Sequence, residues 1–233
     1  TAAFNAATGT RRWQVTAAEG TAALDVIVDA TRVYVTGQGN IGINGFLTVV
    51  AYDRATGARL WRTDANPPTG CCAIGLRIAL VPDGSLVVAG RTATGGYFDW
   101  WIVAMNTNGT VRWQGLRDAA VTGDEIPAAV FVLADGTTVV SGTGGPVTHD
   151  ILGNSYMQGV TAGYSSNGTL LWEGFSKLPT VWATALPNGD VCATGGYDAL
   201  ITCWRISGAA NNQPPTAVVS AAPSTGVAPL TVI

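Results

Sequence analysis

The sequence predicts an all-β protein built from about four repeats, each with four antiparallel strands. First, short apolar runs rich in Val, Ile, Leu, Thr and Trp end at Gly, Asp or Asn, which is typical of strands followed by turns. Second, glycine is abundant, with 30 in 233 residues. Third, three sequence markers recur with one shared spacing, which indicates a repeat architecture.

The composition indicates a folded protein with a large core. Hydrophobic residues make up 47% of the chain and charged residues 12%. The net charge of −3 argues against a nucleic-acid partner, since such proteins need a basic surface. No apolar run approaches the ~20 residues of a membrane helix, so we expect no transmembrane segment. Because the sequence starts at Thr1, we expect a processed or partial chain.

The repeat is defined by a glycine, a turn and a tryptophan. Gly37, Gly90, Gly142 and Gly195 each follow a β-rich run and are 53, 52 and 53 residues apart. The turns before the last three are Asp83–Gly84, Asp135–Gly136 and Asn188–Gly189. The tryptophans are Trp13, Trp61, Trp113 and Trp172. These spacings predict repeating units of about 52 residues.

Four strands can be placed in the clearest unit. They cover residues 76–81, 85–90, 100–105 and 110–115. A Pro-Asp-Gly turn joins the first two, the loop 91–99 joins the middle two, and an Asn-Gly turn joins the last two. Four antiparallel strands in each unit of this length predict the blade of a β-propeller.

Several stretches resemble known propeller repeats. "AYDRATGARLW" (51–61) resembles the tryptophan-docking motif of quinoprotein, or PQQ-type, propeller repeats. "ALVPDGSLVVAG" (79–90) and "FDWWIVAMNTNGTVRWQ" (98–114) resemble repeats of secreted bacterial propeller proteins. The resemblance covers residues 1–208. It implies that the strand-four tryptophans, Trp13, Trp61, Trp113 and Trp172, dock neighbouring blades onto one another.

The two ends of this region do not form whole units. Residues 1–7 and 10–15 match strands three and four of a unit, and residues 181–206 supply strands one to three. One alternative is a closed four-bladed ring that borrows 10–15 as its last strand. The other, which we favour, is part of a larger ring whose other blades lie upstream or on another chain.

The C-terminal stretch is distinct. Residues 209–217 form a polar, proline-containing linker. "PPTAVVSAAPSTGVAPLTVI" (214–233) resembles the first strand of a PKD domain, an immunoglobulin-like module. We therefore divide the chain into propeller repeats (1–208) and a linker with the start of a PKD-like domain (209–233). The resemblance implies a secreted or cell-surface bacterial protein.

Cys192 and Cys203 flank a hairpin. If Tyr197 and Asp198 form its turn, the two cysteines face each other across the strands, within disulfide range. We expect a disulfide there, worth ~2–4 kcal/mol. The alternative is two buried thiols in a cytosolic protein.

Cys71 and Cys72 are adjacent and could form a vicinal disulfide. Such a ring is similar to one that quinoprotein dehydrogenases place against the PQQ cofactor. The sequence lacks a recognisable set of the other PQQ ligands, so we do not expect PQQ.

Catalytic residues are not evident. A Ser-His-Asp triad would have to use the one histidine, His149, but the sequence has no Gly-x-Ser-x-Gly nucleophile motif. Asp124 and Glu125 could bind calcium or begin a strand, and calcium is the one cofactor left open.

Blade geometry gathers the longest loops on one face. The loops 38–45, 91–99 and 143–156 and the linkers 64–75 and 117–126 should emerge together. The candidate ligand-binding residues there are Tyr97, Phe98, Asp99, Asp124, His149, Asp150 and Asn154, and Asp64, Cys71 and Cys72 lie on the same face. Aromatic rings beside carboxylates and amides suit sugar recognition.

These observations favour a non-catalytic binding or adhesion protein, with a polysaccharide or another protein chain as its partner. A structural or assembly subunit of an extracellular complex is one alternative. A quinoprotein-like dehydrogenase fragment is the other.

Overall fold

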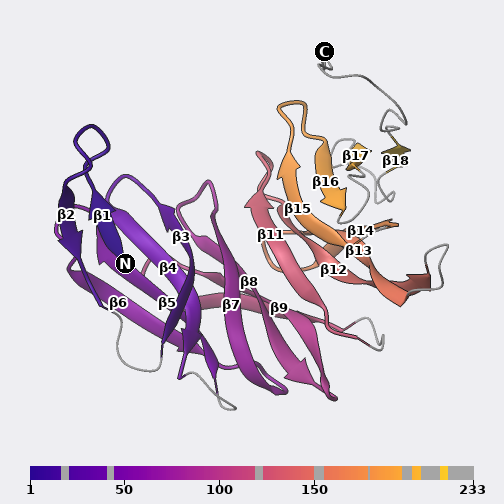
Figure 1. The fold of residues 1–233 in the computed structure, drawn as a ribbon, viewed down its shortest axis with the longest axis horizontal. Helices are drawn as coiled ribbons and strands as arrows, with labels where there is room; N and C mark the ends of the chain where they lie inside the picture. Colours follow the sequence, from indigo (N-terminus) through magenta and orange to yellow (C-terminus); the bar gives the residue numbers. More distant parts are fainter. Residues whose placement is uncertain are drawn as a thin grey trace.

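The computed structural model describes residues 1–16, 21–40, 45–118, 123–149, 155–177, 179–195, 201–205 and 216–219. Within these ranges all regular secondary structure is β-strand, arranged in antiparallel sheets (Figure 1). Sheet A contains β1 (Ala2–Phe4) and β2 (Arg11–Gln14). Sheet B contains β3 (Ala22–Val28), β4 (Arg32–Gly39), β5 (Phe46–Asp53) and β6 (Arg59–Ala65).

The other three sheets repeat the four-stranded pattern of sheet B. Sheet C contains β7 (Cys71–Leu80), β8 (Leu86–Thr94), β9 (Tyr97–Met105) and β10 (Val111–Arg117). Sheet D contains β11 (Ile126–Val132), β12 (Thr138–His149), β13 (Ser155–Tyr164) and β14 (Leu170–Ser176). Sheet E contains β15 (Thr180–Ala185), β16 (Val191–Gly195), β17 (Ile201–Arg205) and β18 (Thr216–Val219).

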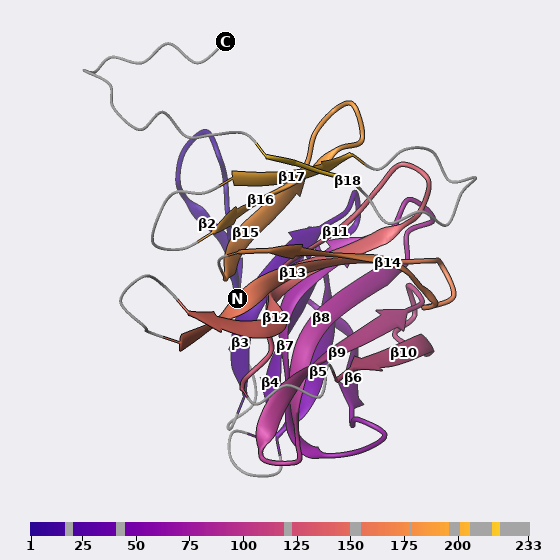
Figure 2. The same cartoon turned by 90° about the vertical axis from the view of Figure 1, so that its right-hand side faces the viewer.

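The sheets follow one another along an arc, from β1 and β2 to β15–β18 (Figure 1). The first strands of sheets B to E, which we call the inner strands, lie side by side: β3 contacts β7, β7 contacts β11, and β11 contacts β15. Seen from the side, sheet E lies above sheet D (Figure 2). The described residues do not close a ring. The prediction of four-stranded antiparallel sheets is confirmed.

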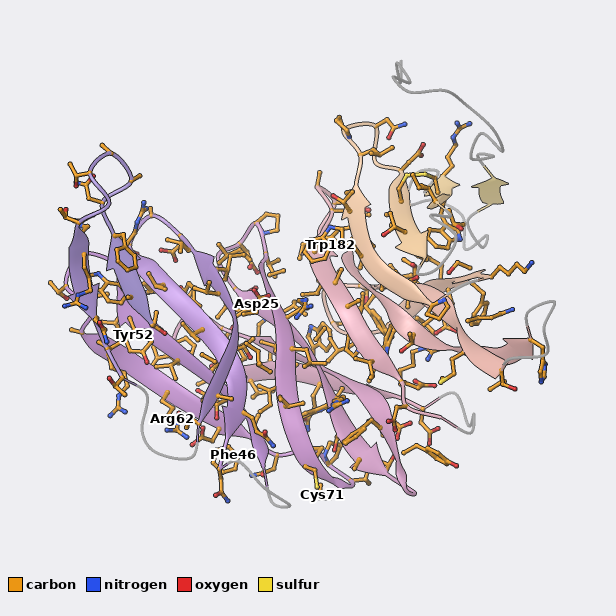
Figure 3. All side chains as sticks on the ribbon, in the orientation of Figure 1. Asp25, Phe46, Tyr52, Arg62, Cys71 and Trp182 are labelled. Atoms are coloured by element: carbon orange, nitrogen blue, oxygen red, sulfur yellow. A yellow bond between two sulfur atoms is a disulfide. The ribbon has the colours of Figure 1, made fainter. Side chains whose placement is uncertain are left out.

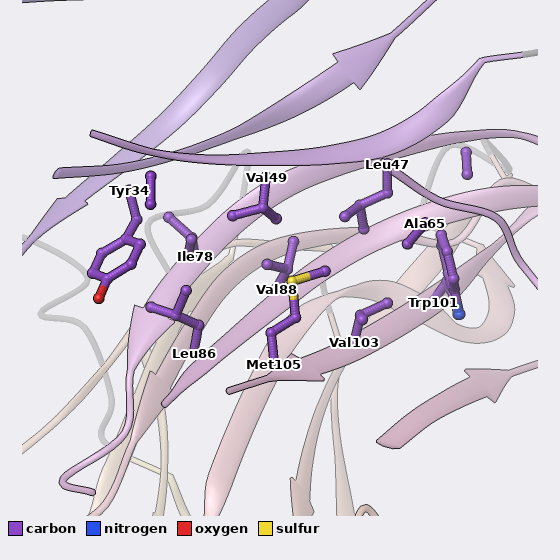
Figure 4. Close-up of a cluster of buried hydrophobic side chains, with 12 residues drawn as sticks. Tyr34, Leu47, Val49, Ala65, Ile78, Leu86, Val88, Trp101, Val103 and Met105 are labelled. Atoms are coloured by element: carbon purple, nitrogen blue, oxygen red, sulfur yellow. The ribbon is translucent and has the colours of Figure 1, made fainter. Parts of the chain in front are cut away.

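Hydrophobic cores lie between consecutive sheets. Between sheets B and C, Tyr34, Leu47 and Val49 pack against Ile78 and Val88 (Figure 4). Similar clusters join sheet A to B, C to D, and D to E. Each sheet is therefore stabilised mainly by its neighbours, as in repeat proteins generally.

The recurring glycines mark a β-bulge on the inner strands. In sheets B to D the strand register shifts directly after the residue that faces Gly37, Gly90 or Gly142. A Cβ atom on these glycines would collide with the carbonyl oxygens of Ala22, Ile74 and Ile126, respectively. Gly195 faces the same shift in sheet E. Glycine is needed because the bulge brings the inner-strand backbone so close.

Three segments that the sequence predicted as loops are partly strand. Residues 91–94 and 97–99 belong to β8 and β9, and the ladder continues to the pair Thr94 and Tyr97. Gly95 and Gly96 have positive φ angles, 59° and 99°, and form a two-residue turn, so no longer loop is required. The predicted loop 143–156 likewise begins and ends as strand, and β6 and β7 extend into the linker 64–75.

At the N-terminal end, sheet A has the two strands that the sequence predicts. At the other end, sheet E has four strands, whereas the sequence predicts three. Sheet A has two strands, whereas β18 pairs with β17 as the fourth strand of sheet E. Thr216–Val219 lies within the segment that resembles a PKD domain, so the same residues that motivated that domain serve here as a sheet-E strand. Residues 209–215 of the predicted linker 209–217, and residues 220–233, lie outside the described residues.

The predicted disulfide is confirmed. Cys192 and Cys203 are paired across β16 and β17 and form a bond, with their Cα atoms 4.0 Å apart. The hairpin turn that should contain Tyr197 and Asp198 lies outside the described residues. No helix in the described part of the chain could cross a membrane.

Candidate functional site

The structure brings together only part of the predicted loop face. The amide of Phe98 donates to Asp124 Oδ1 at 3.1 Å, and the amide of Glu125 donates to the Phe98 carbonyl at 2.7 Å. The guanidinium of Arg91 lies 3.9 Å from the centre of the Phe98 ring. Tyr97 is exposed at the start of β9. This corner is held together by protein contacts that already occupy the Phe98 backbone and ring.

Asp99 is not a surface residue as the loop assignment implied. It lies in β9 and is buried, and its Oδ2 atom has no hydrogen-bond partner within the described residues. Burial, followed by the charge of Asp118, raises the pKa of its carboxyl to about 6. Asp99 is therefore poorly placed to hold an exposed ligand.

His149 lies apart from this corner in the chain and in its sheet. It is exposed at the end of β12, opposite Ser155, in sheet D rather than sheet C. Among the described residues, no hydrogen bond joins it to Tyr97, Phe98 or Asp124. Asp150 and Asn154 lie outside the described residues, so their place in the predicted face stays a prediction.

Cys71 and Cys72 begin β7 and are both thiols in the structure. Figure 3 labels Cys71. A hydrogen bond with Cys71, followed by burial, raises the pKa of Cys72. The Cys71 carbonyl accepts a hydrogen bond from Thr92 Oγ1 at 2.9 Å. A vicinal disulfide stays a prediction for the oxidised protein.

Three of the repeated tryptophans connect neighbouring sheets. The indole N–H of Trp13 donates to the Arg54 carbonyl, that of Trp61 to Thr107, and that of Trp113 to Ser166, each at 2.9 Å. The three rings lie on Gly57, Gly109 and Gly168 of the following sheet. Trp172 packs in the core between sheets D and E. The corresponding turn of sheet E lies outside the described residues.

A buried ion network, which the sequence analysis missed, connects sheets C and D. Arg117 Nη1 contacts Glu125 Oε2 at 2.8 Å, and Arg117 Nε contacts Glu173 Oε1 at 2.6 Å. Arg117 Nη1 also donates to the Gly144 carbonyl at 3.0 Å. Burial alone would lower the pKa of Arg117, but its hydrogen bond to Glu173 and the two negative charges raise it overall. Arg117 is the shared positive partner of both carboxylates, so the network connects β10 to β14 and to the residue before β11.

A groove of about 320 Å³ lies along the inner strands. Its walls come from β3, β7, β11 and β15, and include Asp25, Arg77, Phe131 and Trp182. Trp182 is 56% exposed, which is unusual for a tryptophan. Figure 3 places Asp25 on β3 and Trp182 near the start of β15.

Two charged residues of the groove are fixed by the backbone. Asp25 Oδ2 accepts the amide of Ile78 at 3.0 Å, and Arg77 Nε donates to the Ala128 carbonyl at 2.8 Å. Arg77 Nη1 donates to the Leu76 carbonyl at 2.8 Å. The Asp25 bond joins β3 to β7, and the Arg77 Nε bond joins β7 to β11. These bonds hold consecutive inner strands together along the groove.

The groove residues share one position in the repeat. Asp25, Arg77 and Trp182 each follow the β-bulge of their inner strand, and Ala129 holds this position in sheet D. The sequence analysis missed them because it treated strand one as core. The signal that could have found them is their fixed spacing of 12 or 13 residues before the recurring glycine.

The groove combines a stacking surface with charged and hydrogen-bonding groups. An exposed indole can pack against a sugar ring or an apolar side chain, and a guanidinium can donate to a carboxylate or hydroxyl group. In the described part of the chain, no three His, Cys, Asp or Glu side chains cluster to hold a metal ion. The exposed indole and the guanidinium suit the groove to binding.

Comparisons with known proteins agree with the repeat architecture. Residues 1–226 match a PQQ-type family model described as outer membrane protein assembly factor BamB. A protein of unknown function from Bacteroides caccae has a similar fold, with a TM-score of 0.51 and 17% identity over 93% of this chain and 68% of that one. An endo-arabinase from Bacteroides thetaiotaomicron gives a TM-score of 0.48 and 10% identity over 92% and 81%.

No curated protein matches the chain. The Bacteroides caccae structure supports the fold alone, and the endo-arabinase is too distant to carry an argument. The family match spans nearly the whole sequence and agrees with the repeated four-stranded sheets. The chain therefore belongs to the BamB-like family of PQQ-type β-propeller repeat proteins.

Proposed function

We propose that the protein is a non-catalytic binding module that holds a carbohydrate ligand in the groove of its inner strands. The single observation that carries the proposal is the exposed indole of Trp182 in one groove with Arg77 and Asp25. Stacking on the indole would supply affinity, and the guanidinium would favour a sugar that carries a carboxylate. This moves the candidate site from the loop face to the inner strands.

The location that fits this function is outside the cytoplasm, at the cell surface or in secreted form. The disulfide between Cys192 and Cys203 supports it, because disulfides persist in oxidising compartments.

Affinity electrophoresis tests the proposal. The protein should be retarded in gels that contain polygalacturonate, and less so in gels with neutral arabinan. Trp182→Ala should abolish the retardation, and Arg77→Met should remove the preference for the acidic polymer. Leu60→Ala, which truncates an exposed apolar residue on β6, is the matched control and should change nothing. The proposal would be contradicted if the protein migrated equally in gels with polygalacturonate, with arabinan and with no polymer.

A role in protein assembly is the second candidate. The description of the matching family names an assembly factor, and β3 carries an exposed apolar face beside a two-stranded sheet. Exposed apolar patches commonly bind other proteins.

The third hypothesis, a quinoprotein-like enzyme, gains no support from the described residues. PQQ in such enzymes is held with a calcium ion, and no cluster of carboxylates is present near Cys71 and Cys72 in the described part of the chain. Of the two acidic residues considered for calcium, Glu125 is paired with Arg117 and Asp124 accepts from the Phe98 amide. These residues do not fit the cofactor.

A further inference from the structure

The groove extends along β11 and β15 beyond the residues that carry the proposed function. Its lining includes residues 129–132 of β11 and 182–185 of β15, whereas β3 and β7 contribute only Asp25, Arg77 and Ile78. Three residue steps along a strand span roughly 10 Å. This length exceeds that of one pyranose ring, so the groove has room for two linked sugars.

One end of the groove carries its positive charge. Ala129 of β11 and Trp182 of β15 hold the position after the bulge, as Arg77 does in β7. Arg77 is the one positively charged side chain among the described residues that line the groove. Its Nε bond to the Ala128 carbonyl brings the guanidinium to β11, beside Ala129. An acidic sugar would therefore lie at this end, with its ring on the indole.

Asp25 lies at the same end, on the other side of Arg77. β7 contacts both β3 and β11, so Arg77 lies between Asp25 and β11. The two carboxylate oxygens of Asp25 accept the amides of Val26 and Ile78, at 2.9 and 3.0 Å. These amides stabilise its negative charge, and its oxygens can also accept from sugar hydroxyl groups.

The far end of the groove has no charged side chain among its described residues. It is lined by Phe131 and Val132 of β11 and by Thr184 and Ala185 of β15. Trp182 and Thr184 are both exposed and lie on one face of β15, since alternate residues of a strand point the same way. A sugar chain that stacks on Trp182 and runs along β15 would therefore meet Thr184 next.

Thr184 supplies a hydrogen-bonding group at the far end. Its Oγ1 donates to the Ala185 carbonyl at 3.4 Å, and a hydroxyl group that donates keeps its acceptor lone pairs. Phe131 is half-buried and adds an apolar surface. A second carboxylate here would lose water without gaining a cation, which is costly. A neutral sugar would lose less, because its hydroxyl groups can donate to Thr184 and its ring can pack on Phe131.

We propose that the groove binds two consecutive sugars of an acidic heteropolysaccharide, with an acidic sugar at Arg77 and Trp182 and a neutral sugar at Phe131 and Thr184. This inference rests on the proposed function and deepens it, because it names the repeating unit that the groove selects. A polymer in which acidic and neutral sugars alternate satisfies both ends of the groove. A polymer of acidic sugars alone satisfies only the first end and binds more weakly.

The test compares three soluble probes by isothermal titration calorimetry: galacturonate, digalacturonate, and the disaccharide of galacturonate linked to rhamnose. The mixed disaccharide should bind about tenfold more tightly than galacturonate and about threefold more tightly than digalacturonate.

The outcomes separate this inference from the proposed function. Equal affinity for galacturonate and the mixed disaccharide would mean that the groove holds one sugar. Binding of digalacturonate as tight as that of the mixed disaccharide would mean that the far end does not select a neutral sugar. Either result, or a mixed disaccharide that fails to bind a protein still retarded by polygalacturonate, would overturn the inference and leave the proposed function in place. A protein that binds no probe and is not retarded by polygalacturonate would contradict both.

Two substitutions of one residue make the test specific. Thr184→Val removes the hydroxyl group and keeps the shape, so it should weaken binding of the mixed disaccharide about fivefold and leave galacturonate binding unchanged. Thr184→Lys places a cation at the far end and should make digalacturonate the tighter ligand. Thermal unfolding checks that each variant is folded.

The charge-matched control is Gln114→Lys, at an exposed position of β10 outside the groove. It should keep the order of affinities found for the natural chain. If Thr184→Lys keeps that order as well, the second sugar does not lie at Thr184 and the proposal fails.

Discussion

Gly109 lies beneath the indole of Trp61, so closely that a Cβ atom there would come within 2.8 Å of Trp61 Cε3. The tryptophan belongs to sheet B and the glycine to the turn between β9 and β10 of sheet C. The same relationship joins Trp13 to Gly57 and Trp113 to Gly168. One indole and one glycine therefore connect each pair of consecutive sheets from A to D.

Replacing Gly109 with alanine should destabilise the protein through this contact. Gly109 has a φ angle of 86°, so alanine adds backbone strain as well as a collision with the ring. Gly136→Ala is the matched control, because Gly136 has the same φ angle and nothing within 4 Å of the added Cβ.

Urea unfolding should show that Gly109→Ala costs about 1–3 kcal/mol more than Gly136→Ala, the range for overpacking a close contact. An equal cost for the two variants would mean that the ring contact contributes nothing beyond strain.

The buried ion network gives a second prediction. Arg117→Met should cost about 3–5 kcal/mol in the free energy of unfolding, because Glu125, only 1% exposed, would lose its positive partner. The control is Arg112→Met, which breaks a pair with Asp83 in which both side chains are substantially exposed.

This surface pair should be worth about 0–1 kcal/mol. Chemical denaturation of both variants at neutral pH measures the difference. Similar losses would show that Glu125 is solvated after the substitution rather than left buried.

The free energy of unfolding should depend on pH because of Asp99. The pKa of its carboxyl is about 6 in the folded protein, against an ordinary value of 3.8. Between these two values the folded chain holds a proton that the unfolded chain has released, so stability should fall as pH rises from about 4 to about 6. The fall should be about 2–3 kcal/mol, because a shift of one pKa unit corresponds to about 1.4 kcal/mol.

Asp99→Asn should flatten this slope and raise stability at pH 7, measured by urea unfolding across the pH range. Asp83 provides a contrast of opposite sign. Hydrogen bonds from Ser85, followed by the one from Arg112, hold the pKa of Asp83 at about 2, so its contribution is present above about 4 and is lost as pH falls toward 2. An unchanged slope in Asp99→Asn would show that Asp99 is not the titrating group.

The disulfide in sheet E gives a further prediction. Cys192→Ser together with Cys203→Ser should lower the stability of sheet E by about 2–3 kcal/mol, because the bond closes a short loop across β16 and β17. Thermal unfolding with and without a reductant should reproduce the loss in the natural chain. The double variant should be insensitive to the reductant, and a melting temperature that reductant leaves unchanged in the natural chain would argue against the bond.

The four-stranded sheets could be predicted from the sequence because turn and strand signals are local. The Asp-Gly and Asn-Gly turns fix the hairpins, and the pairing of Cys192 with Cys203 follows from the length of one hairpin. The prediction of a loop at residues 91–99 was wrong because Thr92 and Thr94 make the end of β8 look polar in the sequence. Their backbones nevertheless pair with β9, since the Gly95–Gly96 turn needs only two residues.

The interior and the groove could not be predicted because their partners are distant in the sequence. Arg117 meets Glu173 from 56 residues away, and no local pattern indicates that pair. Arg77 looks like one polar residue in an apolar strand, yet its neighbour in space is the carbonyl of Ala128 on the next inner strand. Such contacts depend on how one sheet is rotated on another.

The bulge opposite each recurring glycine also limits which changes the chain can tolerate over evolutionary time. A single insertion in an inner strand would move the crowded carbonyl away from its glycine and place a side chain there instead, while leaving the hairpin turns intact. The addition or loss of a complete unit would keep every glycine opposite its own bulge. Length variation among relatives should therefore occur in steps of whole units or in the hairpin tips, and rarely within β3, β7, β11 or β15.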